Sequence, residues 1–568
     1  MKVLIVGSGG REHAIAMAVA KSPRVDKIYC APGNAGIAAQ AECVPIGAME
    51  FDKLIAFAKE KAIDFTIIGM DDPLVGGIVD AFEAEGLKVF GPRKNAAILE
   101  GSKAFSKDLM KKYNIPTAGY ETFDDPKKAI EYLENAKMPI VLKADGLALG
   151  KGVLICNTLE EAKAGVREIM EDKKFGAAGN HMVVEEFMTG REVSVLSFVD
   201  GKTIQIMSSA QDHKRAGDGD TGLNTGGMGN FSPSPFYTDE VDAFCKKYIY
   251  QATVDAMAAE GRPFTGVIFF GLMLTPEGPK VLEYNARFGD PEAQVVLPRM
   301  KNDIIDVMEA CVDGRLDQID LQFEDNACVC VVLASDGYPV SYKKGFPIHG
   351  LEKFEGKDDY FCYHAGTAFN DKGEIVTNGG RVLGITATGP DLKTARAKAY
   401  EATEWVTFEN KYMRHDIGKA ITAEKRGAHA ALGAEFLLAH GEDPKVCAAV
   451  AAHHADPGTD GGVYGVLCAA ADAISSARPG ARQENVGDYI QRLENLEKIA
   501  KAHAGVLHVY AVQAGRDLRV VVDPSVVGDS AAAELAGEIC RDISAQLKFP
   551  GMIRVTVVRE LRCVEYAK

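Results

Sequence analysis

The stretch Val281–Gln294 reads VLEYNARFGDPEAQ and decides how the rest of the chain is interpreted. Residues two apart in a strand point to the same face, so Glu283 and Asn285 project together. A carboxylate beside an amide oxygen offers the hard oxygen ligands that Mg²⁺ accepts. Arg287 follows, with a planar fork that can hold a phosphate or carboxylate through two hydrogen bonds. The stretch predicts a metal and anion site; the alternative is an edge strand with a solvated acidic face.

Length and composition indicate a soluble protein of several domains. The 568 residues are 47% hydrophobic and 25% charged, which is ordinary globular composition. A formal net charge of −16 argues against a general nucleic-acid or membrane surface, although a local basic pocket can still bind an anion. The twelve cysteines form no CxxC pair, and no apolar run approaches membrane-spanning length. We expect a cytoplasmic location without a membrane segment.

The first hundred residues alternate strand and helix patterns, which predicts a parallel α/β sheet. Its first strand, Lys2–Val6, runs into Gly7-Ser8-Gly9-Gly10 and then a helix at Arg11–Ala20. Free backbone N–H groups at a helix N-terminus favour an anion. The loop is either such a contact or a plain turn, because Glu12 stands where a dinucleotide fingerprint has its third glycine.

A second glycine-rich loop, Ala144–Gly152, joins strands expected at Ile140–Lys143 and Val153–Cys156. Three glycines and two lysines at this position indicate a flexible hairpin that can fold over phosphates. The spacing is not that of a strand-to-helix phosphate loop, and a simple turn is the alternative.

Carboxylates and a long polar segment follow. Glu185 and Glu186 end a strand at Val183–Phe187 and Glu192 begins the next, where they suit ribose or adenine, or simply solvent. Gln211–Gly229 has no periodicity, and so long a loop is usually functional or disordered. A helix at Asp239–Glu260 and strands at Gly266–Leu274 and Lys280–Asn285 complete this part of the chain.

With these residues assembled, the chain from Met1 to about Ile421 resembles the phosphoribosylamine–glycine ligase family, ATP-grasp enzymes of purine biosynthesis. One departure is Met70-Asp71, where many members carry Pro-Glu. The resemblance rests on GSGGREHA (Gly7–Ala14), APGNAG (Ala31–Gly36), DPL (Asp72–Leu74), KADGLALGKGV (Lys143–Val153), DHKR (Asp212–Arg215), NTGGMG (Asn224–Gly229), EYNARFGDPE (Glu283–Glu292), HAGT (His364–Thr367) and NGGRVL (Asn378–Leu383).

The resemblance implies three α/β ligase domains: a substrate-binding domain at 1–101, an ATP-grasp domain at 102–325 and a small C-terminal domain at 326–421. It also implies a reaction in which glycine's carboxylate attacks the γ-phosphate of ATP. 5-Phosphoribosylamine then captures the acyl phosphate, which gives glycinamide ribonucleotide, ADP and phosphate. No protein nucleophile is needed, so the site works by positioning and charge neutralisation.

The resemblance also implies residue roles. Mg²⁺ or Mn²⁺ is expected on Glu283 and Asn285. ATP is expected at Lys103, Lys143, Gly146, Gly150, Lys151, Gly152, Glu185, Glu186 and Glu192. The substrates are expected at Gly9, Gly10, Arg11, Glu12, Asn224, Thr225, Gly226, Gly227, Arg287, Gly289 and Asp290. The catalytic set is expected to be Arg287, Lys143, Asp212 and Lys214.

The chain continues beyond the family's usual end at Arg414–Ala420. Patterns predict a helical part at 422–500 and a small α/β part at 501–568, with helices at His429–Ala439, Pro444–Ala452, Val463–Ser476 and Val486–Ala504, and strands at Val506–Gln513, Leu518–Val522 and Ile553–Val558. This tail resembles the C-terminal part of ribonuclease Y, an HD-domain phosphodiesterase. The motifs are HDIGKAI (His415–Ile421), GAHAALGAE (Gly427–Glu435), AAHHAD (Ala451–Asp456), AADAISSARPGAR (Ala470–Arg482), QAGR (Gln513–Arg516) and the closing residues from Phe549.

The tail holds metal-ligand residue types at His415, Asp416, His429, His453 and Asp472. Adjacent histidines on a helix point apart, so at most one of His453 and His454 can share a centre with Asp472. The earlier histidine that the HD family requires is missing, because ligase sequence occupies its place. We expect a degenerate module for assembly, self-association or regulation; the alternative is residual metal-dependent hydrolysis.

Three further hypotheses compete with the ligase. Another ATP-grasp ligase or a carboxylase is disfavoured by the DHKR and NTGGMG segments and by the lack of a biotinyl-lysine segment. A phosphodiesterase or RNA-binding protein whose activity resides in the tail is disfavoured by the negative net charge of the chain and by the missing histidine. An inactive scaffold is disfavoured because the residues expected to bind ATP, metal and substrate are intact: Lys103, Lys143, Glu283, Asn285 and Arg287.

Overall fold

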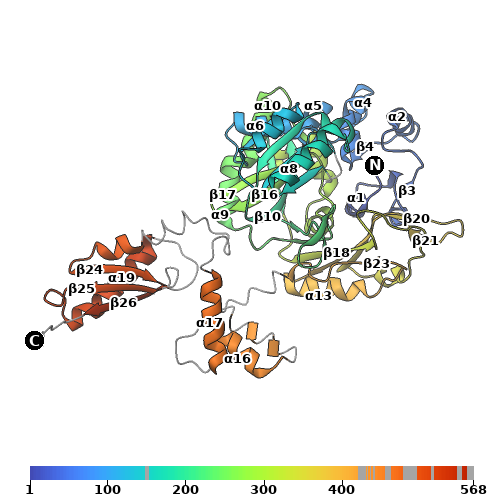
Figure 1. Cartoon of the computed structure of the whole chain (residues 1–568). Coiled ribbons are helices and arrows are strands. Elements are labelled where there is room, and N and C mark those ends of the chain that lie inside the picture. Colours follow the sequence, from blue (N-terminus) through green and yellow to red (C-terminus); the bar gives the residue numbers. More distant parts are fainter. Residues whose placement is uncertain are drawn as a thin grey trace, which may run out of the picture. The chain divides into compact units, whose positions relative to one another are not determined.

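The computed structural model describes residues 1–147, 152–419, 430, 433–434, 437–438, 442–453, 462–476, 496–512, 517–546 and 553–559. The chain divides into two compact units, Met1–Ala423 and Glu424–Lys568 (Figure 1). Each unit is described by itself.

The first unit begins with a five-stranded parallel sheet in the order β3-β2-β1-β4-β5. Alternate residues of β1 enter different cores: Val3 and Ile5 pack in one, Leu4 and Val6 in the other. Burial on both faces explains the continuous apolar run. The bounds are β1 Lys2–Gly7, β2 Lys27–Pro32, β3 Glu42–Cys43, β4 Phe65–Ile68 and β5 Val89–Phe90, with helices α1 Gly10–Ala20, α2 Phe51–Glu60, α3 Asp71–Gly76, α4 Ile78–Ala84 and α5 Lys94–Gly101.

Two antiparallel four-stranded sheets follow. The first has the order β6-β9-β7-β8, with β6 Tyr120–Phe123, β7 Ile140–Ala144, β8 Val153–Cys156 and β9 Met182–Glu186. The second has the order β11-β10-β16-β17, with β10 Arg191–Asp200, β11 Ile204–Ile206, β16 Thr265–Thr275 and β17 Gly278–Asn285. Their helices are α6 Lys103–Lys112, α7 Pro126–Leu133, α8 Leu159–Val166, α9 Asp239–Cys245, α10 Gln251–Ala259 and α12 Ile304–Val312.

A third large sheet joins two distant parts of the sequence. Residues 211–232 supply β12 and β15, and residues 327–412 supply the rest, so the sheet crosses from the predicted ATP-grasp region into the predicted C-terminal domain. Helix α13 (Leu392–Thr403) packs on this sheet. The strands are β12 Gln211–Asp212, β15 Gly229–Ser232, β18 Ala327–Ser335, β19 Tyr360–His364, β22 Arg381–Gly389 and β23 Lys411–Tyr412, with separate hairpins β13 Arg215–Gly217 with β14 Thr221–Asn224 and β20 Thr367–Phe369 with β21 Ile375–Thr377.

The hairpin β13–β14 is held by the segment just before the tail. The buried Arg414 guanidinium donates to both carboxylate oxygens of Asp416 (2.7 and 2.8 Å), to Asp220 Oδ1 (2.9 Å) and to the Arg215 carbonyl (3.0 Å). The Gly219 N–H donates to Asp416 Oδ2 at 2.8 Å. Arg414 therefore fixes the hairpin through buried, charge-assisted hydrogen bonds.

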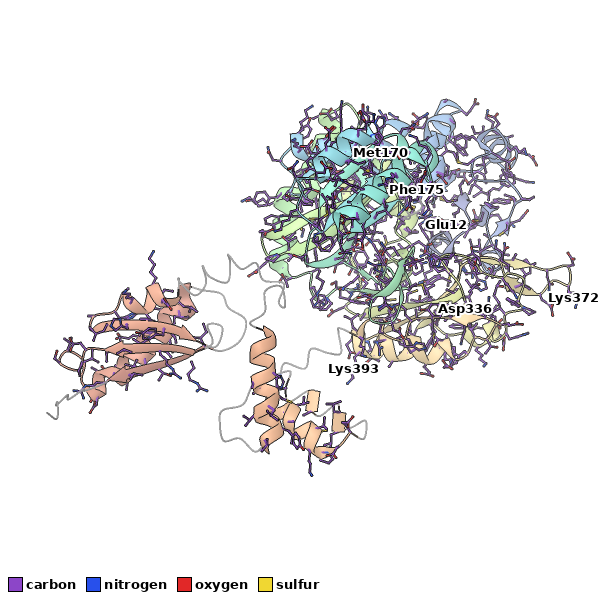
Figure 2. All side chains as sticks on the ribbon, viewed as in Figure 1. Glu12, Met170, Phe175, Asp336, Lys372 and Lys393 are labelled. Carbon is purple, nitrogen blue, oxygen red and sulfur yellow. The ribbon has the colours of Figure 1, made fainter. Side chains whose placement is uncertain are left out.

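Buried histidines join the N-terminal sheet to the third sheet. His13 Nδ1 accepts from the His364 backbone N–H at 2.7 Å, and Asn34 Nδ2 donates to the carbonyls of Ser8 and His364, both at 2.8 Å. Glu12, beside His13, lies inside the unit, whereas Lys372 lies at the far tip of the β20–β21 hairpin (Figure 2). The segments Ala31–Gly36 (APGNAG) and His364–Thr367 (HAGT) thus connect the N-terminal sheet to the third sheet.

The second unit contains α16 (Pro444–Ala452) and α17 (Gly462–Ser476) in its helical part. Its α/β end has β24 (Val506–Val512) antiparallel to β25 (Asp517–Val522), and β25 parallel to β26 (Arg554–Arg559). Leu535, Ile539 and Ile543 of α19 (Asp529–Gln546) cover one face of this sheet.

The structure departs from the sequence predictions in two helices. The predicted helix 239–260 is interrupted by a π-helical turn at Lys246–Tyr250 between α9 and α10. Helix α19 was not predicted, although Leu535, Ile539 and Ile543 recur at helical spacing. Of the predicted helix at His429–Ala439 only residues 430, 433–434 and 437–438 are described, and these are helical; of Val486–Ala504 only the part from 496 is described.

Three histidines, of which His13 and His364 are buried and His213 is partly buried, make the first unit sensitive to acid. Burial lowers the pKa of His13 and His213 to about 4 and that of His364 to about 3, from 6.5. The unfolded chain binds protons between pH 6.5 and 4 where the native state does not, so this stability is full above pH 6.5 and is lost as pH falls toward 4. We expect urea midpoints, followed by fluorescence of the single tryptophan Trp405, to fall over that range.

Replacement of one of these histidines should reduce the acid sensitivity. His213→Asn is expected to remove about 3 kcal/mol of the pH-dependent change, and the exposed His349→Asn should not alter it. Identical pH profiles for all three proteins would contradict the account.

Removal of the Arg414 guanidinium should destabilise the same unit. Arg414→Met leaves Asp416 without its ion pair and is expected to lower the free energy of unfolding by about 3 kcal/mol. Trp405 fluorescence during urea unfolding measures the change, and the half-exposed Arg315→Met is the control. A change below about 0.5 kcal/mol would show that Arg414 does not hold the hairpin.

Candidate active site

Charged side chains gather around the end of β17, as the sequence predicts. Glu283 Oε1 lies 3.3 Å from Lys214 Nζ, and the same lysine also pairs with Glu192 on β10. The pKa of Glu283 is lowered to about 2. Lys214 is the main cause, and Lys143 and Lys103 act in the same direction, whereas burial opposes the shift. Glu283 is therefore a carboxylate among three lysines, which is an environment suited to phosphates and a divalent cation.

Lys143, on β7, contacts β17 at a β-bulge. Gly271 pairs with Glu283 but Leu272 pairs with Val281, so Leu282 is the extra residue in β17. The Leu282 carbonyl accepts a hydrogen bond from Lys143 Nζ at 3.2 Å. The bulge thus joins the two four-stranded sheets at the point where their charged residues meet.

Asn285 and Arg287 share a buried partner. With its amide assigned from its neighbours, Asn285 donates to Glu100 Oε1 at 2.9 Å, which leaves its side-chain oxygen as an acceptor. Arg287 Nη2 lies 2.8 Å from the same oxygen and 3.7 Å from Asp71 Oδ2. Arg287 Nε is buried without a hydrogen-bond partner. The structure brings the predicted metal and anion residues together and adds Glu100 and Asp71 to them.

The chemistry of the donor set fits Mg²⁺ held jointly with a nucleotide. Glu283 supplies an ionised oxygen and Asn285 a neutral one. Among the described residues no group of three or more His, Cys, Asp or Glu side chains forms a closed metal cage. Mg²⁺ commonly takes one or two protein oxygens and completes its shell with phosphates and water, and Mn²⁺ suits the same oxygens.

The predicted phosphate-binding loop is partly described. Lys103 Nζ donates to the Gly146 carbonyl at 2.8 Å, and Asp145 accepts from the Ala104 N–H at the start of α6. Burial lowers the pKa of Lys103, although Glu283 raises it. Gly152 accepts from the Ala144 N–H at 2.8 Å, so the ends of the loop pair as strands. Gly150 and Lys151 lie outside the described residues.

The carboxylates expected at adenine and ribose have different environments. Glu185 is buried between Lys143 Nζ (2.9 Å) and Lys107 Nζ (3.1 Å). Its predicted contact with adenine or ribose stays a prediction. Glu186 is exposed and accepts from the Gly119 N–H at 3.2 Å. Glu192 pairs with Lys214. Of the three, Glu186 remains open to a ligand.

The N-terminal glycine loop lies beside the turn that follows β17. Glu12 is buried and accepts from the Gly9 N–H and from Arg11 Nε, so it caps α1 and orients Arg11. Both carboxylate oxygens of Glu12 thus accept hydrogen bonds within the protein. Arg11 Nη1 donates to the Phe288 carbonyl at 3.2 Å. A side chain at Gly10 would meet Gln294 Nε2 at 2.6 Å, which explains the glycine.

Arg381 joins the NTGGMG segment to the turn after β17. Its Nη1 donates to the carbonyls of Gly226 and Asp290, both at 2.8 Å, and its Nη2 lies 3.4 Å from Asp290 Oδ2. Thr225 donates from N and Oγ1 to the Lys214 carbonyl, at 2.7 and 2.9 Å. The predicted residues Asn224–Gly227, Lys214 and Asp290 are thus held in one arrangement.

A buried carboxylate pair lies beneath these loops. Burial raises the pKa of Asp212 well above its usual range and raises that of Glu292, and the two carboxyls repel each other. Glu292 accepts from Ser194 Oγ at 3.1 Å. A side chain at Gly227, where φ is +116°, would meet Asp212 Oδ1 at 2.6 Å, and one at Gly289 would meet Glu292. These glycines let the loops close over the acids.

Several residues of this cluster were not assigned from the sequence: Asp71, Glu100, Lys107, Glu292 and Arg381. Lys107 lies in a helix whose lysines resemble a solvated face, and Glu100 ends an otherwise ordinary helix. Glu292 lies in the motif EYNARFGDPE and Arg381 in the motif NGGRVL. Membership in these motifs is the sequence feature that could have identified both residues.

Two of the tail residues predicted to hold metal, His415 and Asp416, lie in the first unit and have partners there. Asp416 is committed to Arg414 and Gly219, and the exposed His415 pairs through Nδ1 with Asp218 Oδ2 at 3.1 Å. His453 Nδ1 lies 2.5 Å from the Val450 carbonyl at the end of α16. Asp472 is placed on α17 by its backbone, and His429 lies outside the described residues.

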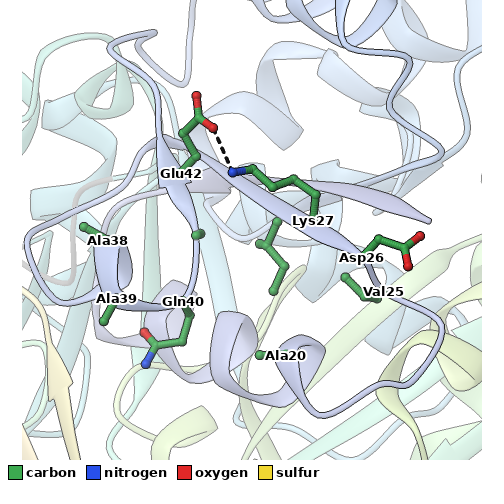
Figure 3. Close-up of a pocket in the computed structure, with 10 residues that line it drawn as sticks. Ala20, Val25, Asp26, Lys27, Ala38, Ala39, Gln40 and Glu42 are labelled. Atoms are coloured by element: carbon green, nitrogen blue, oxygen red, sulfur yellow. Dashed lines mark ion pairs between the residues drawn. The ribbon is translucent and has the colours of Figure 1, made fainter.

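A separate hollow of about 410 Å³ lies at the edge of the N-terminal sheet, where Lys27 and Glu42 form an ion pair (Figure 3). None of the residues lining it belongs to the cluster around Glu283. We do not assign it to the reaction.

Family models agree with the geometry. The phosphoribosylglycinamide synthetase N domain matches residues 1–100, the ATP-grasp (A) domain 101–293 and the C domain 328–420. The chain belongs to the phosphoribosylamine–glycine ligase family. A ligase of Brucella melitensis is 51% identical and one of Caldanaerobacter subterraneus 50% identical, covering 75% and 73% of this chain and 99% of each relative. The predicted activity, glycinamide ribonucleotide synthesis in purine biosynthesis, is confirmed at this level.

Solved structures support the same fold. The ligase of Thermotoga maritima is 36% identical with a TM-score of 0.64, and covers 73% of this chain and all of that one. A biotin carboxylase domain of Hydrogenobacter thermophilus, 16% identical with a TM-score of 0.57, covers 72% of this chain and 91% of that one and shares the fold. No helix among the described residues is long and apolar enough to cross a membrane.

Loss of the Glu283 carboxylate should abolish the ligase reaction. Glu283→Ala removes the charged oxygen predicted to hold the metal, and we expect kcat to fall by about a thousandfold or more while the melting temperature is kept. Phosphate release from ATP with both substrates measures kcat. The exposed Glu277→Ala, at the turn before β17, is the matched control. Retained activity in Glu283→Ala would refute the metal assignment.

Proposed function

We propose that the first unit joins glycine to 5-phosphoribosylamine through a glycyl phosphate, with ATP as phosphoryl donor. The observation that carries the proposal is Glu283, ionised and surrounded by Lys103, Lys143 and Lys214. Attack by the glycine carboxylate on the γ-phosphate breaks the bond to ADP. The ribosylamine nitrogen then attacks the acyl carbon, expels phosphate and loses a proton.

On the nucleotide side, the lysines would neutralise the triphosphate and the cation would link it to β17. Lys103 and Lys143 would contact phosphates, and the loop Gly146–Gly152 would cover them. Glu283 and Asn285 would hold Mg²⁺ or Mn²⁺, which supplies charge neutralisation at the transferred phosphoryl group. Glu186 would face adenine or ribose, and Glu192 would hold Lys214 in place.

On the substrate side, cationic side chains and backbone N–H groups would hold glycine and the phosphoribosyl group. The buried, unpartnered Arg287 Nε supports an anionic ligand at Arg287. Gly9, Gly10 and Arg11 would form one wall of the pocket. Gly289, Asp290 and Asn224–Gly227 would form the other, joined by Arg381. Asp212 and Lys214 would lie below the reacting groups.

We propose that the tail is a degenerate HD module that serves assembly, self-association or regulation. The commitment of Asp416 to Arg414 supports this, because it removes one expected metal ligand from the tail. Residual phosphodiesterase activity is the competing possibility.

Phosphate release should separate the two units. We compare the full chain with a version ending at Ala423, the end of the first unit, with ATP, glycine and freshly made phosphoribosylamine. Because every site residue lies before Ala423, we expect equal kcat in both, with both substrates required. Loss of activity only on truncation would make the tail part of the ligase, and no activity in either would refute the proposed function.

Two further measurements test the tail. Size-exclusion chromatography should show a larger assembly for the full chain than for the shortened one. Hydrolysis of bis(4-nitrophenyl) phosphate with Mn²⁺ should be undetectable in both, and turnover by the full chain alone would establish the competing possibility.

A further inference from the structure

Glu185, at the end of β9, lies between two buried lysines. Lys107 Nζ is 3.1 Å from Oε2 and Lys143 Nζ is 2.9 Å from Oε1, and all three side chains are at most 5% exposed. The group carries one negative and two positive charges in a region that water barely reaches. One lysine is enough to neutralise the glutamate, so the other has charge to offer elsewhere.

The two lysines are anchored differently. Lys107 Nζ also donates to Thr117 Oγ1 at 2.7 Å, and Thr117 Oγ1 donates to the Val281 carbonyl at 2.7 Å. Lys107 is thereby tied to the backbone of β17. Lys143 instead reaches toward the site: its charge contributes to the low pKa of Glu283, and its Nζ donates to the Leu282 carbonyl.

We propose that Lys107 is a positioning residue that keeps Glu185 neutralised so that the charge of Lys143 is available to the phosphates of the nucleotide. This role of Lys107 rests on the proposed function only in that Lys143 is assigned to phosphate. A buried ion pair that loses one partner leaves an uncompensated charge, which is strongly unfavourable. With Lys107 in place, Lys143 can turn toward a phosphate while Glu185 stays paired.

The protonation of Lys107 agrees with this role. Burial lowers the pKa of Lys107 to about 8, the charge of Glu185 raises it and that of Lys143 lowers it. At pH 7 Lys107 is therefore mostly protonated, and binding is best measured at that pH.

The test is ADP binding in the presence of Mg²⁺, measured by calorimetry at pH 7 on the full chain. In Lys107→Met, Lys143 becomes the only cation on Glu185, so we expect the ADP Kd to rise about tenfold. In Lys107→Met/Glu185→Gln the buried charge is gone and Lys143 is released, so we expect the Kd to return to within about threefold of the wild type. Lys112→Met, exposed on the same helix α6, is the matched control.

The outcomes separate this role from a structural one. An unchanged Kd in Lys107→Met, or a double variant that binds no better than Lys107→Met, would overturn the proposal. Should Lys107→Met fail to fold, as judged by Trp405 fluorescence, Glu185→Gln decides alone: we expect ADP affinity to be kept or increased, and a tenfold loss would overturn it.

A further variant separates this inference from the proposed function. Lys143→Met should weaken ADP at least as much as Lys107→Met does. If Lys143→Met binds ADP normally, the assignment of Lys143 to phosphate fails, and the role of Lys107 fails with it. If Lys143→Met weakens ADP and Lys107→Met does not, only the role of Lys107 fails.

Discussion

The site depends on the cost of burying charge without a partner. Glu283 is stable as a carboxylate because lysines from three different segments surround it, and Glu185 is stable because two lysines flank it. Neither arrangement is a simple pair, because Lys143 acts on both carboxylates and Lys214 also pairs with Glu192. This concentration of lysines is the environment in which we expect the phosphates of a nucleotide and a divalent cation to bind.

The loops over this charge cluster are positioned from the third sheet. Strands β12 and β15 leave the ATP-grasp region and pair with β18, and this carries Asp212, Lys214 and the NTGGMG segment toward Glu283. Arg381 connects that segment to the turn after β17 through hydrogen bonds. Arg414 holds the β13–β14 hairpin in the same way. Arg381 donates to the backbone carbonyls of Gly226 and Asp290, whereas Arg414 donates to the Arg215 carbonyl and to the carboxylates of Asp220 and Asp416.

The tail begins directly after the residues that fix this hairpin. The sequence pair His415-Asp416 is common to the end of the ligase family and to the HD motif, but the structure uses it within the ligase unit: Asp416 binds Arg414, and His415 binds Asp218. The tail's small sheet has its own apolar core.

The sequence by itself determined the family and most strands, and it predicted that Glu283 and Asn285 lie together, because strand alternation places both on one face of β17. Arg287 lies beyond the end of that strand. It also placed α16 and the three strands of the tail, but missed α19. Only the tertiary structure decided which partners those charges have. Lys107, Glu100 and Arg381 come from distant segments, Glu185 pairs with two lysines, and residues 211–232 join a sheet built from residues after 327. A local sequence pattern indicates on which face of a helix or strand a side chain lies. Ion pairs depend on distances between elements that are far apart in the sequence, and a local pattern contains no information about those distances.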